Sequence, residues 1–151
     1  MTILLILLFS IIGAVISAVV GTLWYSNNTP MGRIHMQYLG MDKLSEEEKK
    51  ASMEKGKAMM PKMYAGQLLL SLLTSFAVVY IVAISIQNQL PFLLALGFVV
   101  FNWLTFMVPI IGQGVLWGNV DRKIAWKKFF SDSASNLVSI LIIAYLTSLF
   151  A

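Results

Sequence analysis

The chain has 151 residues, of which 58% are hydrophobic and only 12% are charged, and its mean hydropathy is +0.79. Soluble domains carry about a quarter of charged residues, so this balance is typical of a membrane protein. There is no Cys, which excludes disulfides, thiolate catalysis and Cys-based metal sites. The net charge of +4 comes from two segments, 33–62 and 121–132. Membrane orientation explains such a basic surplus better than nucleic-acid binding does.

Four apolar segments have the length of roughly 20 residues that a bilayer-spanning helix needs. The first, at about 3–24, lacks the basic start of a signal peptide, so we interpret it as a retained helix. Pro91 divides the next uncharged stretch into helices at about 63–86 and 90–116, because proline cannot continue a helix but suits the first turn of the next one. Pro61 begins the second helix in the same way. The fourth is predicted at about 132–150, with Asp132 or Ser131 as its N-cap.

The first loop is predicted to contain a further helix at about 45–60. Ser45 followed by Glu48 is a capping box, in which each side chain bonds the other residue's backbone N–H. Met53, Met60 and Met63 share one side, which would allow this amphipathic helix to lie on the membrane surface. The expected fold is therefore an all-α membrane protein of residues 1–151 as a single transmembrane domain. It is a four-transmembrane-helix bundle with an additional cytoplasmic amphipathic helix.

The orientation follows from the basic residues. All eleven Lys and Arg lie in the first and third loops, which share one side of the membrane. By the positive-inside rule that side is cytoplasmic, so both termini of this multi-pass cell-membrane protein are expected outside.

No catalytic motif is present, and the single histidine, His35, excludes a multi-His metal site within one chain. The sequence favours a non-enzymatic protein with no cofactor and no metal. Seven of the nine methionines lie between residues 31 and 63, and with His35 they raise the alternative of a Cu(I) thioether site. The favoured interpretation is that methionine fills irregular apolar surface there.

Two further patterns lie within the spans. Gly13, Ser17 and Gly21 recur at four-residue spacing along the first helix, which lets another backbone approach closely. Three carboxamides, Gln67, Gln113 and Asn136, are each predicted roughly 6 Å below the same surface at about 1.5 Å rise per residue.

Asn102, Pro109 and Gln113 share one face of the third helix, and Pro109 predicts a kink. One interpretation is a polar intramembrane pocket formed by Gln67, Asn102, Gln113 and Asn136, gated by that kink, with Asp132 at its mouth. The alternative, which we favour, is that these amides form hydrogen bonds between helices.

Four motifs are informative in their order along the chain: GTLWYS at residues 21–26, PMGR at 30–33, FMVP at 106–109 before a Leu-Trp-Gly loop, and WKKFF at 126–130 before the helix with Asn136. In these motifs the sequence resembles the DUF1761 family of uncharacterised bacterial integral membrane proteins. The resemblance covers essentially the whole chain and implies a four-helix membrane protein without an established activity. The charged insert at about 42–60 looks larger than is usual for the family.

Two functions remain open. The first is an oligomeric transporter or channel-like protein for a small solute, which makes a homo-oligomer the expected assembly in the lipid bilayer. The second is a non-catalytic membrane scaffold or accessory subunit, which binds a cytoplasmic protein partner at residues 42–60. No nucleic-acid partner is expected.

Overall fold

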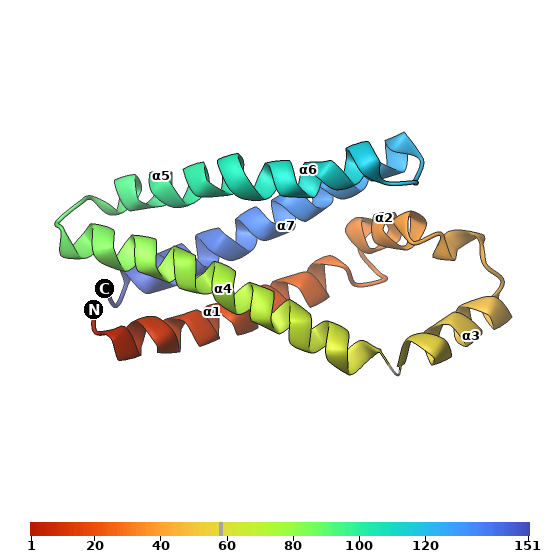
Figure 1. The fold of residues 1–151 in the computed structure, drawn as a ribbon, viewed down its shortest axis with the longest axis horizontal. Coiled ribbons are helices and arrows are strands. Elements are labelled where there is room, and N and C mark those ends of the chain that lie inside the picture. The colour runs from red at the N-terminus through yellow and green to blue at the C-terminus, as the bar shows by residue number, and fades with distance from the viewer. Residues whose placement is uncertain (58) are drawn as a thin grey trace.

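The computed structural model describes residues 1–57 and 59–151, and the regular elements among these residues are all helices (Figure 1). Four of them are long: α1 (Ile3–Trp24), α4 (Met60–Gln87), the composite helix Phe92–Trp117 and α7 (Arg122–Ser148). Each is long and apolar enough to cross a membrane, so the prediction of an all-α chain with four such helices is confirmed. Both termini lie at one end of the molecule, and the short helices α2 and α3 lie at the other (Figure 1).

The fourth long helix begins well before the predicted position near residue 132. Asp121 caps it, since its Oδ1 accepts the backbone N–H groups of Lys123 at 3.0 Å and of Ile124 at 3.2 Å. No Pro or Gly interrupts the following residues, so the helix runs unbroken through the basic segment. The expected N-caps at Asp132 and Ser131 are therefore wrong, and both residues lie inside α7.

The third long helix is a composite of α5 (Phe92–Asn102), η2 (Trp103–Met107) and α6 (Val108–Trp117). Pro91 is the N-cap of α5, as its place in the sequence suggested. The η2 segment is a π-helical turn directly before Pro109. A proline ring crowds the carbonyl four residues earlier, and a wider turn at this point relieves that crowding. The departure from α geometry thus lies next to the predicted kink at Pro109.

The first loop holds two short helices rather than one. The first of them, α2 (Pro30–Tyr38), was not predicted, although its cap was visible in the sequence. The Oγ1 of Thr29 accepts the backbone N–H of Gly32 at 2.9 Å, and Pro30 occupies the first turn. A short 3-10 turn, η1 (Met41–Lys43), then leads towards α3 (Glu46–Lys57).

The α3 helix covers most of the predicted helix at 45–60, of which residue 58 lies outside the described residues. Its capping box is confirmed: Ser45 N donates to Glu48 Oε2 at 2.8 Å, and Glu48 N donates to Ser45 Oγ at 3.3 Å. No residue of α3 is buried, and Met53 is its one large apolar side chain. An amphipathic surface helix on the cytoplasmic side therefore stays a prediction.

Small side chains line the contact between α1, α4 and α7. Gly13 is buried, and a Cβ there would lie only 2.9 Å from the Cβ of Ser75 on α4. Several buried hydroxyls on these helices donate to carbonyls four residues earlier in their own helix, as Ser139 and Thr147 do at 3.0 and 2.8 Å. These hydroxyls are satisfied without spacing the helices apart, whereas those of Ser75 and Ser133 are buried without a partner among the described residues.

The three predicted packing residues differ in their surroundings. Gly13 makes the close approach just described, whereas Ser17 is half-buried and a Cβ at Gly21 would meet nothing within 4 Å. The apolar core lies further along the same helices, around Val79, Val82 and Ile143. Large apolar side chains cover the outer faces of all four long helices, which is the surface that lipid tails would solvate.

Candidate functional site

Polar and aromatic side chains gather at the loop end of the molecule, where α1 meets α7. Trp24 Nε1 donates to Ser131 Oγ at 3.1 Å, and the Tyr25 hydroxyl donates to Asp132 Oδ1. Trp24 ends α1 and Tyr25 caps it, so both side chains project from a helix terminus. The end of α1 is therefore fixed to α7 by two side-chain hydrogen bonds.

Lys128 completes this cluster from one helical turn earlier on α7. Its Nζ lies 2.5 Å from Asp132 Oδ2 and is also bonded to Oδ1. The same ammonium lies 4.9 Å from the ring centroid of Tyr25 and 5.7 Å from that of Tyr38. The Lys128 side chain is only 13% exposed. A carboxylate and two aromatic faces together stabilise a cation that has lost most of its water.

The environment keeps Tyr25 protonated. Burial raises the pKa of its hydroxyl well above the usual value of 10.0, and the hydrogen bond to Asp132 and the charge of Asp132 act in the same direction. Tyr25 is thus a hydrogen-bond donor throughout the physiological range. Asp132 accepts from both Tyr25 and Lys128, so one carboxylate ties α1 to α7 and neutralises a nearby cation.

The short helix α2 covers this cluster. The ring of His35 lies 5.1 Å from the ring of Tyr25, and its Nδ1 is buried without a hydrogen-bond partner among the described residues. Burial lowers the pKa of His35, and the Lys128 charge lowers it further, whereas the Asp132 charge opposes the shift.

Gly32 brings α2 close to the end of α1. A Cβ at this position would lie 2.0 Å from the backbone oxygen of Ser26. Beneath Tyr38 lies a cavity of about 70 Å³ between α2, α6 and α7, with Lys128 and Asp132 in its wall. It is large enough for water or a small ion.

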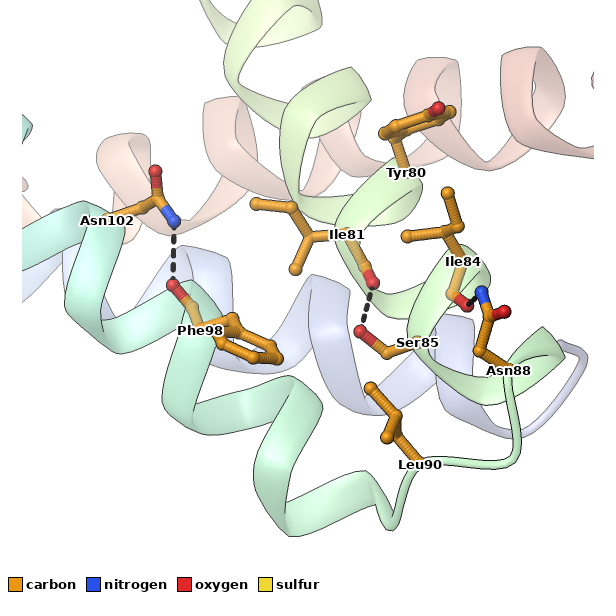
Figure 2. Close-up of a pocket in the computed structure, with 8 residues that line it drawn as sticks. All are labelled: Tyr80, Ile81, Ile84, Ser85, Asn88, Leu90, Phe98 and Asn102. Atoms are coloured by element: carbon orange, nitrogen blue, oxygen red, sulfur yellow. Dashed lines mark hydrogen bonds between the residues drawn. The ribbon is translucent and has the colours of Figure 1, made fainter.

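A larger groove of about 420 Å³ lies between α4 and α5 at the opposite end of the molecule (Figure 2). Its polar groups are the hydroxyls of Tyr80 and Ser85 and the amides of Asn88 and Asn102. Its apolar wall consists of Ile81, Ile84, Leu90 and Phe98. Three of these polar side chains, Ser85, Asn88 and Asn102, donate to backbone carbonyls four residues earlier at 2.7, 2.7 and 2.9 Å, as the dashed lines in Figure 2 show.

The carboxamides predicted to meet do not bond to one another within the part of the chain that the structure describes. Asn136 Nδ2 donates to the backbone oxygen of Asp132 at 2.9 Å, and Gln67 Nε2 approaches Ser71 Oγ at 3.4 Å, each within its own helix. Gln67 and Gln113 are both exposed.

The predicted residues therefore separate into different places. Asn102 lines the α4–α5 groove, and Asp132 belongs to the loop-end cluster together with its cavity. A role for Gln67, Gln113 and Asn136 in a shared pocket stays a prediction.

Sequence reasoning did not find Tyr25, His35 or Lys128 as partners of Asp132. The i,i+4 spacing of Lys128 and Asp132 on one helix was a usable signal for an ion pair. The contacts across α1, α2 and α7 had no such signal, because they depend on how three helices meet.

No group of three or more His, Asp or Glu side chains among the described residues has the geometry to hold a metal ion. The methionines of the copper alternative are spread along the loop and the start of α4, with Met53, Met59, Met60 and Met63 all exposed. The copper alternative stays untested.

No curated protein and no solved structure matches the chain in sequence or structure comparisons. A family model described as a protein of unknown function (DUF1761) matches residues 8–148, which is nearly the whole chain. The resemblance carried by residues 21–26, 30–33, 106–109 and 126–130 is thereby confirmed, and the chain belongs to the DUF1761 family.

Proposed function

We propose that the protein is a homo-oligomeric transporter or channel-like protein for a small, uncharged polar solute. It lies in the cell membrane with both termini outside and its two charged loops in the cytoplasm. The observation that carries the proposal is the groove between α4 and α5, which combines a volume of about 420 Å³ with polar side chains on two of the long apolar helices.

The depth of the groove suits passage into the bilayer. It begins at Asn88 and Leu90, in the connection between α4 and α5, and extends to Asn102 at the end of α5. Ten residues of helix separate Asn102 from the start of α5 at Phe92, which corresponds to roughly 15 Å. This is about half the thickness of the hydrocarbon core.

The chemistry of the wall indicates the class of solute. None of the eight lining residues is ionisable near neutral pH, so nothing in the wall would compensate the charge of an ion. Asn88 and Asn102 each use the amide nitrogen on a backbone carbonyl of the same helix, at 2.7 and 2.9 Å. Their side-chain oxygens remain as acceptors for a hydroxyl or amide of the solute.

A second copy of the chain would close the groove. The composite helix Phe92–Trp117 is the least covered of the four long helices. Of its 18-residue apolar stretch 11% is buried, against 22–39% in the other three helices. Polar groups that face lipid are costly, and an adjacent protomer is one way of covering them.

Purified protein in proteoliposomes tests the proposal, with uptake of urea and glycerol followed by light scattering. We expect uptake faster than in protein-free liposomes, and loss of that excess in Asn102→Leu. Thr105→Val is the matched control, because Thr105 is exposed on the same composite helix outside the groove. Gln113→Leu separates this groove from the pocket predicted from the sequence, and we expect it to retain uptake.

Two results would contradict the proposal: no excess uptake by the wild type for either solute, or unchanged uptake in Asn102→Leu. Loss of uptake in Gln113→Leu but not in Asn102→Leu would move the pathway to the other end of the composite helix.

The scaffold function is the second candidate, and the exposure of α3 favours it. No residue of α3 is buried, so Glu46–Lys57, within the predicted partner segment 42–60, offers a charged surface to a partner. If the protein is a scaffold, proteoliposomes should show no excess uptake. A cross-linker attached at Lys50 should then capture one defined cytoplasmic protein. Diffuse capture of many proteins would count against it.

A further inference from the structure

A small set of titratable side chains lies where α2 packs against α7. From the end of α1, Tyr25 faces the ring of His35, and from α7 the charges of Lys128 and Asp132 act on it. On α2 itself, Tyr38 lies beside Lys128, whereas Arg33 is exposed. Histidine is the residue type whose ordinary pKa lies within the physiological range, and His35 is the single histidine of the chain.

The charge of Asp132 favours an added proton on His35, but burial and the charge of Lys128 outweigh it. The buried Nδ1 of His35 has no hydrogen-bond partner in the described parts of the chain. The nearest acid, Asp132, already accepts from Tyr25 and is paired with Lys128. A proton on His35 would therefore add a second cation beside Lys128 in a partly buried space.

We propose that α2 is an acid-released cover over the Lys128–Asp132 pair, with His35 as its trigger. In the neutral state, the ring of His35 packs on Tyr25, and Tyr38 covers the cavity of about 70 Å³. Protonation separates α2 from α7 and exposes Lys128, Asp132 and the cavity to water. This inference does not depend on the transport proposal.

The direction of the pH dependence follows from linkage. The pKa of His35 in the docked state lies below the ordinary 6.5 that it has when α2 is released. The released state therefore binds more protons, and release becomes more favourable as the pH falls through 6.5. The effect is complete once the pH is below the lowered pKa of the docked state.

Two measurements on the full chain in lipid nanodiscs test the proposal. The chain has one histidine, so ring-labelled histidine gives a single NMR signal whose titration reports His35 directly. Since the chain has no Cys, spin labels on Leu39→Cys and Lys123→Cys report the separation of α2 from α7. Both positions are exposed, and neither lies in the cluster.

We expect an NMR midpoint below 6.5 and a shift of the spin–spin distances to longer, broader distributions between pH 7.5 and 5, with the same midpoint. His35→Phe keeps a ring against Tyr25 but cannot be protonated, so its distances should stay short over the whole range. Should this variant fail to dock even at pH 7.5, His35→Asn is the second neutral replacement.

Constant distances in the wild type while His35 titrates would overturn the proposal. A pH-dependent separation that persists in either docked neutral variant would also overturn it, because the response would then come from a group other than His35. If neither neutral variant docks, the wild-type comparison decides alone, because release with a midpoint different from the NMR midpoint excludes His35 as the trigger.

Discussion

Replacing Gly13 by Ala tests the close contact between α1 and α4. A Cβ at position 13 would lie 2.9 Å from the Cβ and Oγ of Ser75 and 3.2 Å from the Cδ1 of Ile143. The Cβ of Ser75 is fixed by its backbone, so the two helices must shift, and overpacking of this kind costs typically about 1–3 kcal/mol. Ala is favoured over Gly inside a helix by about 1 kcal/mol. We therefore expect a net loss of up to about 2 kcal/mol.

Gly21→Ala is the matched control, because it lies on the same helix and its Cβ would meet nothing within 4 Å. Unfolding in lipid–detergent mixtures, followed by tryptophan fluorescence, gives the free energy of unfolding of each variant. The control should equal or exceed the wild type, and Gly13→Ala should be less stable than the control by about 1–3 kcal/mol. Equal stabilities of the two variants would refute the close contact.

Three further changes test the loop end. Ser45→Ala removes the α3 cap at a cost of about 1 kcal/mol, so hydrogen exchange in residues 46–57 should quicken roughly fivefold, and equal exchange in the mid-helix control Ser52→Ala would contradict this. Gly32→Ala places a Cβ within 2.0 Å of a backbone oxygen, so proteolysis within residues 27–43 should rise; an unchanged rate would exclude the tight turn. Asp132→Asn removes the charge that helps to raise the Tyr25 pKa, so absorbance titration should show tyrosinate at lower pH than in the wild type. Because the folded-state pKa is raised, the stability from this bond is fully present below pH 10.0 and is lost progressively as the pH rises from 10.0 through the raised pKa. An unshifted titration would contradict the coupling.

The sequence predicts the long helices well because they are set by local chemistry. Uninterrupted apolar residues give α1 its bounds, and Pro61 and Pro91 begin or cap α4 and α5. The capping box of α3 is equally local. These features depend on neighbours within a few residues, so one sequence suffices to find them.

One local signal was incomplete and one was misinterpreted. Asn27 and Asn28 do form a turn, as a cluster of Asn, Thr and Pro predicts, but Thr29 and Pro30 also begin a helix that was not predicted. Asp121 caps α7, yet the basic residues that follow it suggested a loop, because they mark the membrane boundary as well as a helix surface.

The candidate sites could not be derived in the same way. Helical rise, counted from the expected helix ends, predicted one depth for Gln67, Gln113 and Asn136, but α7 begins at Arg122 rather than near residue 132. The rotation of each helix about its axis also decides which way a side chain points. Gln67 and Gln113 are exposed for that reason. The contact of Tyr25 with Asp132 spans 107 positions of the chain and depends on how α1 and α7 cross.

The topology is the central claim, and cysteine labelling in intact cells tests it most directly. The chain has no Cys, so Lys50→Cys in the first loop and Ala151→Cys at the C-terminus each give one reactive group. With a membrane-impermeant maleimide, Ala151→Cys should be labelled in intact cells and Lys50→Cys only after the membrane is permeabilised. Labelling of Lys50→Cys in intact cells, with protection of Ala151→Cys, would contradict the cytoplasmic placement of the charged loops.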